Sequence, residues 1–144
     1  MHLDHVELSV ARGTLTEKFC ADLDRLLTDV LGWPGETREL FHPIDHVDRR
    51  ERVYRLPERQ YLVLHETDDP GPLGGDDHIG LLVDSTTLDR LFEGCRDLAA
   101  KDDRVTLRYV IDGKPSSVDV GDWTLRAFFV RYLLPVWLDI QSHD

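Results

Sequence analysis

The chain has 144 residues, of which 41% are hydrophobic and 31% are charged, and this size and composition indicate one ordinary globular domain rather than a disordered segment. Its formal net charge of −11 disfavours nucleic acid and anionic membranes as partners. No apolar run approaches the roughly 20 residues of a membrane span, and the N-terminus lacks the pattern of a secretory signal, so we expect a cytoplasmic protein.

The first half of the chain predicts a strand, a helix and then three strands. Residues 3–10 alternate between apolar and polar side chains, as a half-buried strand does. Thr14-Leu15-Thr16-Glu17 has the form of a capping box, and apolar residues from Leu15 to Leu31 follow at helical spacing until Gly32. The three later strands are expected at 37–42, 52–56 and 60–66.

A stretch rich in Asp, Pro and Gly at 68–76 is the expected linker between module one (1–67) and module two (77–144). The second half repeats the order of the first. A strand at 78–83 precedes a helix that Ser85 or Thr86 is expected to cap. Strands are then expected at 105–111, 125–132 and 136–140, with a polar turn at 112–121, so each half is predicted to be β-α-β-β-β.

An internal repeat supports this duplication. Asp4-His5-Val6-Glu7-Leu8-Ser9-Val10 returns 73 residues later as Asp77-His78-Ile79-Gly80-Leu81-Leu82-Val83, with four of the seven positions identical. A period of about half the chain predicts an α+β fold of two tandem βαβββ modules related by pseudo-twofold symmetry. A ferredoxin-like sandwich, the alternative with the same ingredients, needs neither eight strands nor a duplication.

The repeat also gives each module one histidine at the same place on its first strand. Packed about a twofold axis, His5 and His78 can converge, and two imidazoles with a carboxylate suit Fe, Mn, Ni or Zn. Asp139 is the natural acid, because a carboxylate in an apolar strand needs a cation, a donor or a metal beside it. The alternative for Asp139 is an ion pair with Arg126 or Arg131, which are expected on opposite faces of one strand.

These features resemble the vicinal oxygen chelate superfamily: glyoxalases, bleomycin-resistance proteins, fosfomycin-resistance thiol transferases and extradiol dioxygenases. The resemblance covers essentially the whole chain and implies two modules whose sheets curl around a shared cavity. It also implies that His5, His78 and Asp139 bind one divalent metal ion, with Asp where Glu is usual. Glyoxalase-type sites have a fourth ligand on the last strand of module one, a place held here by Val63 or, in an alternative register, by Glu66. We favour the register with Val63.

The resemblance implies a divalent-metal-dependent lyase, isomerase, transferase or dioxygenase that acts on a small oxygenated molecule by chelation of its oxygens. Candidates for a general base are Glu7, Glu66 and His65. The alternative is a metal-free binding protein that sequesters a small molecule, as bleomycin-resistance proteins do, and a third hypothesis is a structural or regulatory dimer. We expect a homodimer, because dimers are common in the superfamily, and no nucleic-acid or membrane partner.

The two cysteines fall in different predicted helices, one in each module. Neither Cys20 nor Cys95 belongs to a Cys-x-x-Cys pair. We therefore expect two buried, reduced thiols and no disulfide between them.

Overall fold

The computed structural model describes residues 4–42, 47–71 and 75–144, and it divides the chain into two compact units, Met1–Pro72 and Leu73–Asp144. The division falls within the expected linker at 68–76, of which residues 72–74 lie outside the described residues. Each unit is a βαβββ-like module with a mixed sheet and one long helix, so the predicted α+β class and the duplication are confirmed. Among the residues described, no helix is both long enough and apolar enough to cross a membrane.

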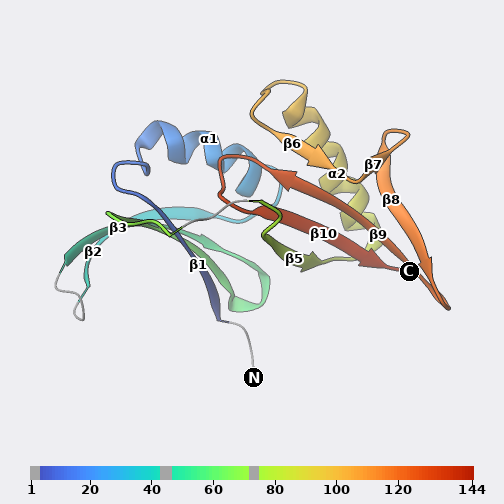
Figure 1. Cartoon of the computed structure of the whole chain (residues 1–144), viewed down its shortest axis with the longest axis horizontal. Coiled ribbons are helices and arrows are strands. Elements are labelled where there is room, and N and C mark those ends of the chain that lie inside the picture. Colours follow the sequence, from blue (N-terminus) through green and yellow to red (C-terminus); the bar gives the residue numbers. More distant parts are fainter. Residues whose placement is uncertain (1–3, 43–46, 72–74) are drawn as a thin grey trace. The chain divides into compact units, whose positions relative to one another are not determined.

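Unit 1 is built around a four-stranded sheet in the order β1-β4-β3-β2. Strand β1 runs parallel to β4, and the other neighbouring strands are antiparallel. Helix α1 lies along one face of this sheet (Figure 1). The elements are β1 (His5–Ala11), α1 (Glu17–Leu27), β2 (Gly35–His42), β3 (Val47–Arg55), the short 3-10 helix η1 (Pro57–Arg59) and β4 (Tyr61–Thr67).

Alternation along the strands gives the sheet of unit 1 one apolar face, which packs under α1. Leu8 of β1 and Leu62 and Leu64 of β4 are buried there, together with Leu23 and Leu26 of α1. Each fully buried leucine contributes about 1.5–3 kcal/mol relative to an exposed one. The residues between them on the same strands point to the opposite face, which is therefore available for polar groups.

Helix α1 begins later than the capping box predicted. Thr16, rather than Thr14, is the N-cap, and its hydroxyl accepts a hydrogen bond from the backbone N–H of Phe19 at 3.1 Å. The backbone N–H of Leu15 instead donates to Glu66 Oε1 at 2.7 Å, and the Leu15 side chain is fully buried. Because Leu15 is bound to β4 in this way, the helix starts after it.

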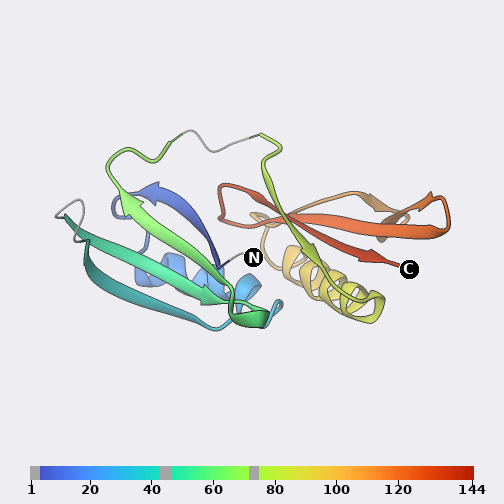
Figure 2. The ribbon, with the colours of Figure 1, turned by 90° about the horizontal axis from the view of Figure 1, so that it is seen from below.

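Unit 2 contains a six-stranded sheet in the order β5-β10-β9-β8-β7, with β6 paired to β9. Strand β5 runs parallel to β10, as β1 does to β4 in unit 1. Figure 2 shows helix α2 along this sheet. The elements are β5 (His78–Leu82), α2 (Ser85–Ala99), β6 (Thr106–Arg108), β7 (Val110–Ile111), β8 (Lys114–Val120), β9 (Trp123–Arg131) and β10 (Trp137–His143).

The N-cap of α2 also differs from the prediction. Asp84, rather than Ser85 or Thr86, caps the helix by accepting a hydrogen bond from the backbone N–H of Thr87 at 2.8 Å. A carboxylate is favoured at a helix N-terminus because the helix dipole is positive there. The same contacts hold the pKa of Asp84 below its usual range.

The largest error of the sequence analysis concerns the segment 112–121, which was predicted as a polar turn. Most of this segment is strand β8, which by its place in the sheet corresponds to β2 of unit 1. The predicted strand at 105–111 is instead two short strands, β6 and β7, separated by Tyr109 at φ 58°. Strand β8 is joined to β9 by backbone hydrogen bonds, so it needs no apolar alternation of its own.

Both cysteines are buried free thiols, as predicted. Cys20 lies in α1 and Cys95 lies in α2, so each unit contains one. Burial raises the pKa of Cys95 to about 12, which keeps this thiol protonated and unreactive.

Candidate metal and ligand site

The histidines of the repeat are the first residues of β1 and β5, and Nδ1 of each contacts an oxygen of a preceding aspartate. His5 Nδ1 lies 2.9 Å from Asp4 Oδ2, and His78 Nδ1 lies 3.1 Å from the backbone carbonyl oxygen of Asp76. Because a carboxylate and a carbonyl oxygen only accept hydrogen bonds, we assign the ring proton to Nδ1 in both residues. This tautomer leaves the Nε2 lone pair free for a metal, and both side chains are 48% exposed.

Asp139 lies in β10, and only 3% of its surface is exposed. Its Oδ2 accepts a hydrogen bond from the side-chain amide of Gln141 and lies 4.0 Å from His78 Nε2. Its Oδ1 is buried without a hydrogen-bond partner among the described residues. Burial raises the pKa of Asp139, although Gln141 and His78 act in the opposite direction. Gly80 lies beside Asp139 on β5, and a Cβ there would meet no atom within 4 Å, so the space is open.

The ion pair considered as an alternative for Asp139 does not form within the described residues. Arg126 pairs with Asp89 of α2 at 2.6 Å, on the helix-facing side of the sheet. Arg131 shares the face of Asp139, but its guanidinium lies over the ring of Trp137, 4.5 Å from the ring centroid. The two arginines therefore point to opposite faces, as predicted, and neither compensates the buried carboxylate.

The donors of unit 2 fit the divalent metal that the resemblance implies. Asp139 offers a buried oxygen that lacks a partner, and His78 offers a nitrogen lone pair on the same side. Across 4–42, 47–71 and 75–144, no three His, Cys, Asp or Glu side chains are grouped closely enough to hold a metal ion. The predicted triad combines His5 of unit 1 with this pair of unit 2, and the structure brings together the two residues from unit 2.

The register of the strands identifies which residue of unit 1 corresponds to Asp139. Two residues after each histidine, Glu7 lies beside Val63 in unit 1 and Gly80 lies beside Asp139 in unit 2. Val63 therefore holds the equivalent place, which is the register that the sequence analysis favoured. An apolar residue stands where glyoxalase-type sites have their fourth ligand.

Glu66, the fourth-ligand candidate of the alternative register, is buried and already bound to the backbone of unit 1. It is 7% exposed, it points to the helix-facing side of the sheet, and it accepts a hydrogen bond from the Leu15 backbone. This position also removes Glu66 from the candidates for a general base. The sequence did not reveal this role, because a carboxylate at the end of a strand gives no signal of the backbone N–H that it will meet.

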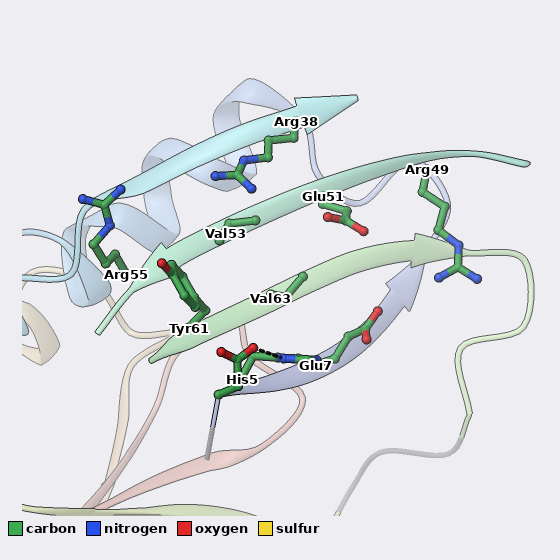
Figure 3. A pocket seen from close by; sticks show the side chains of 10 residues that line it. His5, Glu7, Arg38, Arg49, Glu51, Val53, Arg55, Tyr61 and Val63 are labelled. Carbon is green, nitrogen blue, oxygen red and sulfur yellow. Dashed lines mark hydrogen bonds and ion pairs between the residues drawn. The ribbon is translucent and has the colours of Figure 1, made fainter. Parts of the chain in front are cut away.

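Unit 1 has a pocket of about 380 Å³ on the face of its sheet opposite α1 (Figure 3). This volume lies within the range of small-molecule sites. Val53 of β3 and Val63 of β4 form an apolar floor, and His5, Glu7 and Tyr61 lie along one side of it. His5, one of the two histidines predicted to bind metal, is therefore part of the wall of a ligand-sized pocket.

Glu7 is held by neighbours on the same face of the sheet. Its Oε1 lies 2.7 Å from His65 Nδ1, and His65 Nε2 lies 3.1 Å from Ser9 Oγ. The Glu7 oxygen lies off the direction of the ring N–H, so this close polar contact is not a hydrogen bond. The His65 side chain is only 12% exposed, so it positions Glu7, which faces the pocket.

The sequence analysis missed the charged residues that β3 contributes to this pocket. Arg49, Glu51 and Arg55 alternate along the strand with residues that face α1. The predicted strand began only at residue 52, because the run of charges before it suggested no strand. A two-residue period extended back to Arg49 would have found these side chains.

Neither a protein-family model nor a curated protein matches the chain. Solved structures match over nearly its whole length. The fosfomycin resistance protein FosX from Listeria monocytogenes, in its hexagonal form, has a TM-score of 0.62 at 12% identity, over 99% of this chain and 93% of that chain. A glyoxylase/bleomycin resistance protein/dioxygenase domain from Frankia sp. EAN1pec has a TM-score of 0.59 at 19% identity, over 100% of this chain and 93% of that chain.

A glyoxalase family protein from Enterococcus faecalis has a TM-score of 0.53 at 13% identity, over 99% of this chain and 97% of that chain. At identities this low the similarity shows the fold, and the fold is shared over both modules. The chain therefore has the fold of the glyoxalase, bleomycin-resistance and dioxygenase proteins, which is the vicinal oxygen chelate fold that its sequence resembles.

Proposed function

We propose that the protein is a divalent-metal-dependent enzyme that acts on a small oxygenated molecule, with His5, His78 and Asp139 as the ligands of one Fe, Mn, Ni or Zn ion. When bound, such a metal would chelate adjacent substrate oxygens and act as a Lewis acid. The fold is shared with proteins named for fosfomycin resistance, glyoxalase and dioxygenase families, which is compatible with this chemistry.

The observation that carries the proposal is the state of Asp139. A carboxylate that is 3% exposed, with one oxygen unpartnered, is costly to keep in a fold without a cation beside it. His78 Nε2 lies 4.0 Å from the same carboxylate, and the Asp76 carbonyl fixes its tautomer with the lone pair free. A metal ion would bind the Asp139 carboxylate and His78 Nε2 together. In a metal-free binding protein neither group would have a ligand to bind.

Glu7 is the general base of the proposed reaction. It lines the same pocket as His5, and its carboxylate is held by the 2.7 Å contact with His65 Nδ1. An oriented carboxylate at the pocket wall can take a proton from a substrate carbon or hydroxyl that is bound there. His65 and Ser9 act by holding Glu7 in place, and we expect no direct contact between them and the substrate.

The proposal is tested by calorimetric titration of the chelator-treated, untagged protein with Mn(II), Ni(II) and Zn(II). Wild type should bind one equivalent, and His78→Ala should lose stoichiometric binding while its circular dichroism spectrum is retained. His143→Ala is a matched control, because His143 lies four residues from Asp139 on the same strand and its ring contacts Trp123. Affinity in wild type should fall as the pH is lowered, because the histidines must be neutral to coordinate.

Equal metal binding by wild type and His78→Ala would contradict the proposed metal site. Binding by neither protein would do so as well, and it would favour the alternative of a metal-free protein that sequesters a small molecule. Retained binding in His143→Ala, with loss in His78→Ala, would support the assignment.

A homodimer belongs to the same proposal. Unit 2 leaves Leu82, Tyr109, Ile111 and Val118 each more than half exposed, and large apolar side chains in water favour a protein partner. Sedimentation equilibrium should therefore find a dimer at micromolar concentration, and Val118→Asp should weaken it. A wild-type protein that stays monomeric at every concentration would contradict the dimer.

A further inference from the structure

Most of the charged groups around the pocket of unit 1 already have a partner. Arg38 forms an ion pair with Glu36, and Arg49 also has an interaction partner. The acids that flank the histidines are also partnered, since Asp4 contacts His5 and Glu7 contacts His65. Fewer charged groups are therefore available to a ligand than the number of ionisable residues suggests.

Two opposite charges in this pocket have no ion pair or side-chain hydrogen bond among the described residues. These are the carboxylate of Glu51, which is half-buried, and the guanidinium of Arg55, which is exposed. Both lie on β3 and point to the pocket face, four residues apart, with Val53 between them (Figure 3). At about 3.3 Å per residue, their Cα atoms are about 13 Å apart.

The surroundings of the two charges differ. Arg55 lies opposite Tyr61, and Tyr61 in turn lies opposite His5, so a guanidinium, a phenol and the proposed metal ligand form one row across the sheet. Arginine and a phenolic hydroxyl are suited to bind a carboxylate or phosphonate. Glu51 lies at the other end of the apolar floor formed by Val53 and Val63, and it can bind only a cation or a hydrogen-bond donor.

We infer that this pocket takes a small amphoteric molecule, with its anionic group on Arg55 and Tyr61, its ammonium or other cationic group on Glu51, and an apolar linker over Val53 and Val63. The inference rests on the proposed function only in taking this pocket as the substrate pocket. It goes further by stating the charge pattern and the orientation of the substrate. In this orientation the anionic end lies nearest to His5.

Three probes of matched length test the inference: 6-aminohexanoate with both charges, hexanoate with the anion alone, and hexylamine with the cation alone. Their binding to the full chain is measured by NMR titration at pH 7.5 in the presence of a chelator. We expect 6-aminohexanoate to bind about tenfold more tightly than either single-charge probe, since each ionic contact strengthens binding by about this factor.

The two charges should each control one part of this preference. Arg55→Met should reduce the affinity for 6-aminohexanoate to that for hexylamine, and Glu51→Gln should reduce it to that for hexanoate. Glu93→Gln and Arg96→Met are matched controls, because they remove the same charges from an exposed ion pair on α2. Both controls should leave the affinity for 6-aminohexanoate within about twofold of wild type.

Equal binding of the three probes would overturn the inference, as would a wild-type preference that neither pocket substitution changes. Thermal melts check that each variant is folded, which is expected for substitutions at exposed or half-exposed positions. Metal titration of the same variants separates this inference from the proposed function. If the protein binds metal but does not prefer 6-aminohexanoate, the inference about the pocket is wrong and the metal site stands. If the protein prefers 6-aminohexanoate in chelator but binds no metal, the metal site is wrong and the inference about the pocket stands.

Discussion

Replacement of Asp139 by Asn should stabilise the metal-free protein. The carboxylate is 3% exposed, and its Oδ1 has no hydrogen-bond partner among the described residues. The asparagine side chain has nearly the same shape, removes the charge, and keeps an oxygen that can accept the hydrogen bond from Gln141. The substitution therefore removes the cost of burying the charge and places a neutral amide nitrogen where the unpartnered oxygen stood.

The size of the effect is the excess cost of a charged over a neutral unsatisfied group, and the cost of such a buried group is about 1–3 kcal/mol and higher when it is charged. We expect Asp139→Asn to raise the free energy of unfolding by about 1–2 kcal/mol at pH 7.5, or about 3–6 °C in Tm for a chain of this length. The size of this difference depends on pH. Because burial raises the folded pKa of Asp139 above its unfolded value, wild type is destabilised above the folded pKa, and the difference between the proteins should shrink as the pH falls toward 4.

The assay is thermal unfolding followed by circular dichroism, in chelator, from pH 4.5 to 8. Asp103→Asn is the matched control, because Asp103 is exposed in the same unit and its loss should change stability by less than about 0.5 kcal/mol. Saturating Mn(II) should reverse the order of stability, since a ligand at 100 times its Kd adds about 2.7 kcal/mol to the protein that binds it. A metal-free Asp139→Asn variant that is less stable than wild type, or a stabilisation that does not change with pH, would refute the reasoning.

Three further predictions concern other parts of the fold. Glu66→Gln should lower the free energy of unfolding by about 1–2 kcal/mol in urea denaturation, because it weakens a charge-assisted hydrogen bond to the Leu15 backbone. It should leave metal affinity unchanged, and a loss of metal affinity would contradict the register in which Val63 corresponds to Asp139. Cys20 and Cys95 should resist a thiol reagent at pH 8 in the native protein and both react once it is denatured, so fast native labelling would show that they are accessible. Phe128→Ala should cost about 3–5 kcal/mol in the same denaturation assay, because the fully buried ring leaves a cavity, and a loss below 1 kcal/mol would argue against the packing.

The repeat in the sequence carried most of the information about the architecture. The alternation at 3–10, its repeat at 78–83 and the helical period that follows each are local features, and they predicted two modules and their order correctly. The helix caps were less predictable, because several neighbouring residues can cap a helix. Thr16 rather than Thr14 became the cap because Leu15 is bound to Glu66, and this contact joins residues 51 positions apart in the chain.

Strand β8 shows a second limit of prediction from the sequence. Its polar sequence, Lys114–Val120, favours a turn when taken by itself, yet the backbone of β9 beside it makes it a strand. Pairing with a neighbouring strand uses backbone groups that every residue type has, so the side chains need not show it. The same reasoning applies to Arg49 at the start of β3.

The sequence by itself determined that the chain is two copies of one βαβββ unit, that a histidine begins each copy, and that Asp139 interrupts an apolar strand. These features depend on periodicity and on the repeat, which are present before the chain folds. Only the tertiary structure decided that Val63 rather than Glu66 corresponds to Asp139, that Asp139 keeps one unpartnered oxygen, and that Glu51 and Arg55 face one pocket. The register between strands decides these points, because a shift of one residue turns every side chain to the opposite face of the sheet.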